Sequence, residues 1–155
     1  MKIFISGDHT GYELKEEVKI YLQGLGYEVK DKGPSEYNAD DDYPDFVIPL
    51  SESVAKNKGS FGIILGGSGQ GEAMIANRFE GVRAAVYYGG AEEIIKLSRE
   101  HNNANCLSLG VRFLSEEEAK KAIKLWLETP FPNPDDANWQ RHQRRIDKID
   151  KIDIF

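Results

Sequence analysis

Short apolar runs alternate along this chain with longer segments of helical periodicity. Five runs have the pattern of strands, because each is too short for a helix and is apolar or alternates with polar residues. These runs are Lys2–Ser6, Tyr27–Asp31, Phe61–Leu65, Ala84–Tyr87 and Cys106–Leu109. Strands that are each followed by a helix favour a parallel sheet with helices on both faces. The pattern therefore predicts an α/β fold with about five parallel strands.

The segments between the strands carry apolar residues every three or four positions, which is the spacing of one helical face. The predicted helices run from Leu14 to Leu25, Phe46 to Val54, Glu72 to Phe79, Ala91 to His101 and Glu116 to Leu127. Pro49 limits how early the second helix can begin, because proline lacks a backbone N–H. Residues 32–42, which are rich in Gly, Pro, Ser, Asn and acidic side chains, are predicted to form a surface loop.

The chain is strongly charged after Trp139, but Ile146, Ile149 and Ile152 recur at every third position. This spacing predicts a terminal helix with one narrow apolar stripe. A helix with so narrow an apolar stripe has little stability on its own in water, so we expect it to pack on another subunit.

Composition limits the function. The 155 residues, 40% of them hydrophobic, are enough for one domain spanning residues 1–155. A net charge of −6 argues against a nucleic-acid partner, whereas the local basic cluster from Arg141 to Lys151 suits a small anion. A single cysteine, Cys106, fits a reducing compartment, and no apolar run has membrane-spanning length, so we expect a cytoplasmic protein without a membrane partner.

The run Gly66-Gly67-Ser68-Gly69-Gln70-Gly71 follows a predicted buried strand and ends at Glu72. Backbone N–H groups in such a loop can converge on an oxyanion or a phosphate. The run fails both the P-loop and the dinucleotide fingerprints, since Glu72 stands where Lys or the third glycine is required. A carboxylate beside an oxyanion site suits proton abstraction next to a carbonyl, although Glu72 could equally be an acid that complements the helix dipole.

Three further clusters contain all three histidines of the chain. Gly7-Asp8-His9-Thr10-Gly11 follows the first strand, His101-Asn102-Asn103 ends a helix, and Arg141-His142-Gln143-Arg144-Arg145 opens the terminal helix. Each has a plain structural explanation: a helix N-cap, a histidine that favours a helix C-terminus, and a solvated basic face. Arg141 and Arg145, however, lie on one helical face, where paired guanidinium groups can grip a phosphate.

Together, these motifs resemble the ribose-5-phosphate isomerase type B family, which also includes galactose-6-phosphate isomerase subunits. The matching segments are Gly7-Asp8-His9 with Gly11, Asp42-Tyr43-Pro44, Gly66 to Glu72, Ala76-Asn77, Gly81 to Ala84, Arg99 to Asn105, Gly110-Val111-Arg112 and Arg141 to Arg145. One group of the family has a catalytic cysteine at the position of Gly66, and another has a glutamate at the position of Glu72. This sequence resembles the second group, and Cys106 does not match the catalytic cysteine.

The resemblance implies a role for each matching residue. The catalytic candidates are Glu72 as the base, His101 for opening the furanose ring, and Ser68, which contacts the sugar. The substrate-binding candidates are Asp8, His9, Tyr43, Gly67, Gly69, Gln70, Gly71, Asn102, Arg112, Arg141, His142 and Arg145. Among them, Asp8 contacts the sugar, His9 lies near the phosphate, Asn102 helps to hold the enediolate, and the three arginines with His142 bind the phosphate.

The resemblance also implies a Rossmann-like three-layer αβα sandwich and a homodimer, with a tetramer of paired dimers as the alternative, and a site built across the dimer interface. It implies no metal and no organic cofactor. We therefore expect an aldose–ketose isomerase that interconverts ribose 5-phosphate and ribulose 5-phosphate. A six-carbon substrate such as allose 6-phosphate or galactose 6-phosphate and a non-catalytic sugar-phosphate-binding protein are the alternatives, because Tyr87–Ala91 and Phe131–Asp136 could reshape the pocket.

Overall fold

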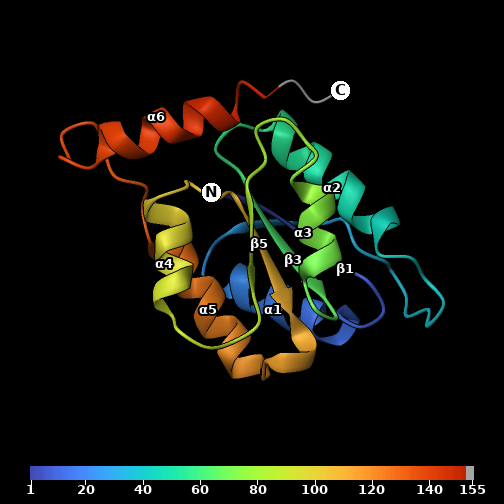
Figure 1. Ribbon diagram of the computed structural model, residues 1–155. Coiled ribbons are helices and arrows are strands. Elements are labelled where there is room, and N and C mark those ends of the chain that lie inside the picture. The colour runs from blue at the N-terminus through green and yellow to red at the C-terminus, as the bar shows by residue number, and fades with distance from the viewer. Residues whose placement is uncertain (153–155) are drawn as a thin grey trace.

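The computed structural model describes residues 1–152, which form a five-stranded sheet covered by helices on both faces (Figure 1). The strands are β1 (Lys2–Gly7), β2 (Glu28–Asp31), β3 (Phe61–Gly66), β4 (Ala84–Tyr87) and β5 (Cys106–Gly110). Their order across the sheet is β2-β1-β3-β5-β4, and every neighbouring pair is parallel. The predicted αβα sandwich with five parallel strands is confirmed.

Each face of the sheet has its own hydrophobic core. Helices α1 (Tyr12–Gly24), α4 (Glu93–Glu100) and α5 (Glu116–Glu128) cover one face, and α2 (Pro44–Lys56) and α3 (Gln70–Ala76) cover the other. Successive strand residues alternate between the cores: Ile63 packs with Trp126 of α5, whereas Ile64 packs with Leu50 of α2. Because both faces are covered, the exposed polar groups that could serve a ligand are at the two edges where strands begin and end.

Helix α2 begins earlier than we predicted, at Pro44, and continues through Pro49. Pro44 is at the start of the helix, where a missing N–H removes no intrahelical bond. Pro49 does remove one, at a typical cost of about 3 kcal/mol. Val47, Leu50 and Val54 are nevertheless buried by this helix, and each contributes roughly 1.5–3 kcal/mol. The prediction about Pro49 was wrong because packing on the sheet outweighs one lost hydrogen bond.

Other helix boundaries also differ from the prediction, by up to three residues. Helix α3 begins two residues before Glu72, which places that residue in the first turn, and it ends at Ala76 instead of Phe79.

The terminal helix is present as α6 (Trp139–Ile149) and lies beyond the strand ends opposite to the arrowheads in Figure 1. Of its isoleucine stripe, Ile146 is buried, whereas Ile149 and Ile152 are 50% and 65% exposed. Within residues 1–152, no helix is long and apolar enough to span a bilayer.

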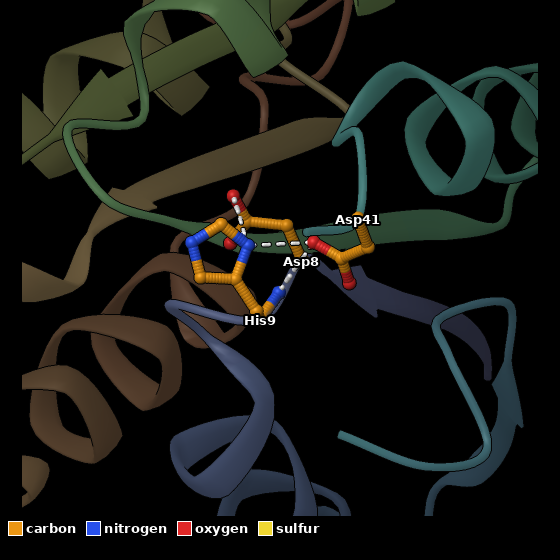
Figure 2. A group of neighbouring side chains, drawn as sticks. All are labelled: Asp8, His9 and Asp41. Atoms are coloured by element: carbon orange, nitrogen blue, oxygen red, sulfur yellow. Dashed lines mark hydrogen bonds and ion pairs between the residues drawn. The ribbon is translucent and has the colours of Figure 1, made fainter. Parts of the chain in front are cut away.

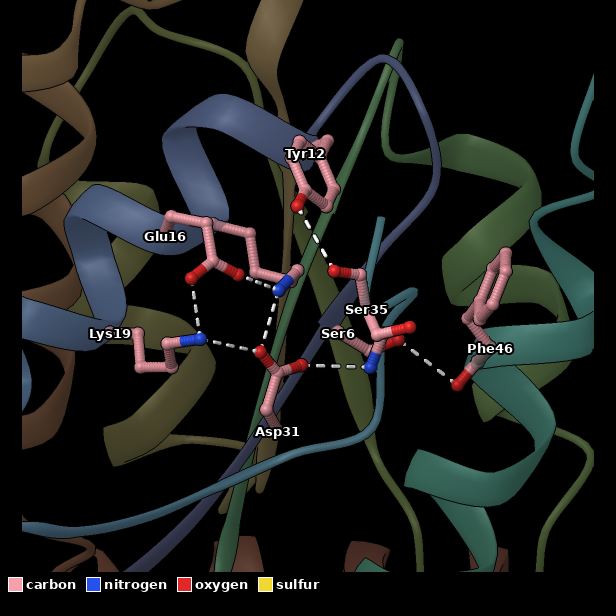
Figure 3. A network of polar contacts seen from close by, with 9 residues as sticks. Ser6, Tyr12, Glu16, Lys19, Asp31, Ser35 and Phe46 are labelled. Atoms are coloured by element: carbon pink, nitrogen blue, oxygen red, sulfur yellow. Dashed lines mark hydrogen bonds and ion pairs between the residues drawn. The ribbon is translucent and has the colours of Figure 1, made fainter. Parts of the chain in front are cut away.

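A fully buried lysine, Lys15, ties α1 to the edge strand β2, where Figure 3 shows its partner Asp31. The Nζ atom of Lys15 lies 2.6 Å from a carboxylate oxygen of Asp31, whose other oxygen accepts the backbone N–H of Gly33 at 2.9 Å. The hydroxyl of Tyr12 donates to the carbonyl of Ser35 at 3.3 Å. These contacts anchor the first part of the loop that connects β2 to α2.

Candidate active site

Three loops meet at the carboxyl edge of the sheet, after the adjacent strands β1, β3 and β5. They are residues 7–11, residues 66–70 and the short 3-10 helix η1 (Val111–Phe113). The chain leaves β1 into α1 on one face and leaves β3 into α3 on the other face. Such a divergence between neighbouring strands opens a crevice, and this is where ligands bind in open α/β sheets.

The glycine-rich loop is held in a defined conformation. Gly69 has the left-handed φ of 75°, which favours glycine, and its carbonyl accepts a 2.8 Å hydrogen bond from the buried hydroxyl of Ser108 on β5. The hydroxyl of the exposed Ser68 accepts the backbone N–H of Gln70 at 3.3 Å. The loop therefore presents its backbone to the crevice while β5 fixes its position.

Glu72 points back from α3 over the end of β3, and its side chain takes the space above Gly66. A Cβ atom at position 66 would overlap the Oε1 atom of Glu72, so only glycine leaves room for this carboxylate. Glu72 is 4% exposed. Burial raises the pKa of its carboxyl group, the charge of Asp8 raises it further, and a hydrogen bond from its own backbone N–H opposes the shift. A carboxylate with a raised pKa is a stronger base than an exposed one.

Polar side chains line the loop on either side of Glu72. The guanidinium of Arg112 lies against Gly67, where a Cβ would be 3.3 Å from its central carbon, and the Arg112 backbone N–H donates to the Gly67 carbonyl at 3.2 Å. The hydroxyl of Tyr43 lies against Gly71, 2.6 Å from the position a Cβ would take. A positive charge and a phenol thus flank the backbone groups of the loop.

Asp8 and His9 face the glycine-rich loop from the end of β1. Asp8 is 6% exposed, and one oxygen accepts the backbone N–H groups of Thr10 and Gly11 at 3.0 and 3.3 Å. The Nδ1 atom of His9 lies 2.6 Å from a carboxylate oxygen of Asp41 (Figure 2). The ligand atoms of these three side chains lie within 4.8 Å of one another, but a direct hydrogen bond between His9 and Asp41 accounts for the short N–O distance, so we assign a histidine–aspartate pair.

A second polar group lies at the opposite edge, where the strands begin. His101 ends α4, and the nearby Asn105 carbonyl accepts the N–H of Gly62 at the start of β3, at 2.8 Å. The ring of His101 stacks on that of His142 from α6, with centroids 4.3 Å apart and planes at 12°. Burial lowers the pKa of His142, and its neighbours His101 and Arg145 lower it further.

A cavity of about 470 Å³ opens beside this stack. The segment that we expected to extend the approach to the arginines lines it, through Phe131, Asn133 and Asp136. Arg141 and Arg145 are exposed on α6. This edge therefore offers positive charge and imidazole nitrogens, but Glu72 is not among the residues that line the cavity.

Within one chain, the predicted site residues form two separate groups. The carboxyl edge brings together Asp8, His9, Tyr43, Gly67, Ser68, Gly69, Gln70, Gly71, Glu72 and Arg112. The amino edge holds His101, Asn102, Arg141, His142 and Arg145. Because the β-sheet separates the two groups, a single copy cannot place His101 and Glu72 on the same ligand.

Sequence reasoning missed two residues that shape these groups. Asp41 lies in the stretch that we predicted as a surface loop, and nothing in a run of three aspartates indicates which of them turns inward. Arg99 is 6% exposed, and it donates to the carbonyls of Ala104 and Thr129 at 2.6 and 3.2 Å. It thereby connects the loop after His101 to the segment that leads into α6. Its position in the matching segment Arg99 to Asn105 was the only available signal.

Comparisons with known proteins agree with this geometry. Residues 3–149 match the family model described as Ribose/Galactose Isomerase. Ribose-5-phosphate isomerase B of Mycobacterium tuberculosis is 40% identical over 95% of this chain and 86% of its own length. The solved structure of the Mycoplasma genitalium isomerase B with bound ribulose-5-phosphate has a TM-score of 0.88 and 40% identity, covering 97% of this chain and 94% of that one. A ribose 5-phosphate isomerase from Thermotoga maritima has a TM-score of 0.85 and 42% identity, covering 97% and 98%.

The fold and the site define an α/β protein with a buried carboxylate beside a glycine-rich loop at the topological switch point. With the matched family model and these relatives, the class is that of the isomerases. The chain belongs to the ribose/galactose isomerase family.

Proposed function

We propose that this isomerase interconverts ribose 5-phosphate and ribulose 5-phosphate through an enediolate, with Glu72 as the base. The observation that carries the proposal is the buried carboxylate of Glu72, which occupies the space above Gly66 beside the glycine-rich loop. Among the relatives, the Mycoplasma genitalium enzyme was solved with ribulose-5-phosphate, which supports a five-carbon substrate.

The proposed chemistry needs one base and one oxyanion site. Glu72 removes the proton on C2 of the open-chain aldose, the electron pair forms the C1–C2 double bond, and the carbonyl oxygen on C1 becomes the oxyanion. Backbone N–H groups of residues 67–71 stabilise that charge, by roughly 3–4 kcal/mol for an effective donor. Glu72 then returns the proton to C1, while the proton of the C2 hydroxyl passes to the oxygen on C1, so that C2 becomes the ketone and C1 carries a hydroxyl.

Gly66 and Glu72 act in this proposal as a pair. In the part of the family with a catalytic cysteine, the base stands on residue 66 itself, whereas here the carboxylate from residue 72 fills the same space. Glycine at position 66 is then a requirement of the glutamate base. Raising the pKa of Glu72 by burial serves the same purpose, because a base works best when its pKa approaches the working pH.

We further propose that a second copy of the chain completes the site. The ring-opening histidine, His101, and the phosphate-binding arginines of α6 lie at the amino edge, so they reach Glu72 only from another subunit. Two of the three isoleucines of the stripe, Ile149 and Ile152, are exposed in a single chain, which supports a partner for this helix. Each dimer would then contain two sites, and each site would use both subunits.

A six-carbon sugar phosphate is the second candidate substrate, because the matched family model covers both ribose and galactose isomerases. The same base and oxyanion site would serve, but the cavity must hold one more carbon between the reacting atoms and the phosphate. The segment around Phe131 lines the cavity beside His101, so its length would affect whether the cavity holds a five-carbon or a six-carbon substrate.

Turnover of ribose 5-phosphate, allose 6-phosphate and galactose 6-phosphate by the purified protein tests both candidates. We expect the highest kcat/KM with ribose 5-phosphate. Glu72→Gln should lower kcat by about 10³-fold with little change in KM, because it removes the base and keeps the shape. Near-normal turnover by this variant would refute Glu72 as the base, and preference for a six-carbon substrate would select the second candidate.

A further inference from the structure

The long loop between β2 and α2 delivers one buried carboxylate to the active site. Of the three consecutive aspartates at residues 40–42, Asp40 and Asp42 are exposed, whereas the side chain of Asp41 is 6% exposed. The far end of the loop is anchored where the hydroxyl of Ser6 on β1 donates to the carbonyl of Phe46 at 3.0 Å. The position of Asp41 is therefore set by contacts at both ends of the loop.

Asp41 makes two hydrogen bonds to a single residue. Its Oδ1 atom accepts the backbone N–H of His9 at 3.0 Å and lies 2.6 Å from Nδ1 of the same residue. An ionised carboxylate can only accept, so Nδ1 of His9 carries the proton of this bond. The second ring nitrogen, Nε2, lies on the side of the ring away from Asp41 (Figure 2). The His9 side chain is 30% exposed, so Nε2 is accessible to a ligand.

The charges around His9 favour its positive form. Asp41 from the loop and Asp8 beside it are negative, and the nearest Asp8 oxygen is 4.0 Å from Nδ1. Arg112 from η1 opposes them. The hydrogen bond to Asp41 is the largest influence, and it raises the pKa of His9 against the lowering effect of burial.

The other oxygen of Asp41 strengthens the case for a charged pair. Oδ2 is buried and has no hydrogen-bond partner among residues 1–152. A buried carboxylate with one unsatisfied oxygen is costly unless a positive charge compensates it. His9 is the positive group in contact with this carboxylate, so each member of the pair stabilises the charged form of the other.

We propose that Asp41 is a positioning residue that holds His9 as an imidazolium with its Nε2–H directed at a doubly charged oxyanion of the ligand. The inference rests on the proposed function only in taking that oxyanion to be the phosphate of the sugar. His9 and Arg112, from two segments of the chain, would then face the anion. Asp41 does not touch the ligand, and its effect is exerted through the charge and orientation of His9.

Sulfate binding measured by calorimetry at several pH values tests this inference. Sulfate suits the purpose because it stays doubly charged across the range in which histidine titrates. Asp41→Asn should weaken sulfate binding by about 5- to 10-fold near pH 7.5, where an unassisted His9 is mostly neutral. Near pH 5.5 the loss should largely disappear, because His9 is then protonated without help.

Matched controls separate this role from a structural one. Asp40→Asn and Asp42→Asn change the same charge on the same loop and should leave sulfate binding unchanged. His9→Gln should weaken binding at both pH values, and adding Asp41→Asn to it should cause no further loss. An Asp41→Asn defect of equal size at both pH values, or no defect at all, would overturn the inference.

The sulfate titration and the turnover assay test the role of Asp41 and the proposed function separately. If the wild-type protein binds sulfate as described but does not isomerise ribose 5-phosphate, the proposed substrate fails and the role of Asp41 stands. If it isomerises ribose 5-phosphate and Asp41→Asn leaves sulfate binding intact at every pH, the role of Asp41 fails and the proposed function stands.

Discussion

The two edges of the sheet carry the same kinds of residue but in different physical settings. At the carboxyl edge, Glu72 and Asp8 are buried, and the glycine-rich loop is bonded to β5. At the amino edge, the arginines of α6 are exposed, and the ring of His101, directly after α4, stacks on that of His142 in α6. One edge holds a buried carboxylate beside the glycine-rich loop, whereas the other holds exposed arginines beside two histidines.

This difference shows how a small α/β chain can divide a reaction between two places. Burial at the carboxyl edge tunes the pKa of Glu72, which requires a rigid, well-packed surrounding. In the proposed dimer, exposure at the amino edge would leave the guanidinium groups of Arg141 and Arg145 accessible to the ligand of the other subunit. The two requirements conflict at a single location, and the proposed dimer resolves them by joining one edge of each subunit to the opposite edge of the other.

The largest effect should come from breaking the carboxyl edge at Gly66. Gly66→Ala places a methyl group where the Glu72 carboxylate lies, so we expect kcat to fall by about 10²- to 10³-fold as the base is displaced. Gly24→Ala is the matched control, since a Cβ there meets nothing within 4 Å. The double variant Gly66→Ala, Glu72→Ala should recover thermal stability without recovering turnover. Full activity in Gly66→Ala would contradict the assigned position of the base.

Subunit mixing tests whether the two edges meet across an interface. Glu72→Gln and His101→Asn should each be nearly inactive, but denaturing and refolding them together should restore about a quarter of the wild-type activity. Half of the dimers are then mixed, and each mixed dimer holds one intact site of two. Refolding either variant alone is the control, and mixtures no more active than these controls would argue against a shared site.

A smaller effect is expected from the amino edge alone. Arg141→Ala should raise KM by about 10-fold and change kcat little, because it removes a phosphate contact that is present in both the ground state and the transition state. Lys58→Ala removes an exposed positive charge elsewhere and should leave KM unchanged. Steady-state kinetics on ribose 5-phosphate measures this KM. An unchanged KM in Arg141→Ala would contradict phosphate binding by this arginine.

The smallest effect concerns stability. Glu72 has a raised pKa in the folded chain, so unfolding favours its ionised form and the native state is penalised above that pKa. Below the unfolded pKa both states are protonated and the penalty vanishes. Glu72→Gln should therefore raise Tm at slightly alkaline pH and have no effect in acid. Thermal unfolding followed by circular dichroism across this range measures the difference, and a lower Tm at alkaline pH would contradict it.

Local patterns predicted most of the fold. The strands and the amphipathic helices follow from residues within a few positions of one another. The predicted start of α2 was wrong, because that start depends on contacts with the sheet that cannot be inferred from neighbouring residues. The site was predictable only as separate motifs, since the glycine-rich loop and the histidine clusters can be recognised individually.

The sequence by itself determined that this is a parallel α/β protein with a carboxylate at the end of a glycine-rich loop. Only the tertiary structure decided that Glu72 fills the space over Gly66, that Asp41 pairs with His9, and that His101 stacks on His142 at the opposite edge. These pairings join segments that lie on different elements, and their energies depend on burial and on distances set by the packed sheet. Periodicity contains no information about such distances, because it describes only which face of each element is apolar.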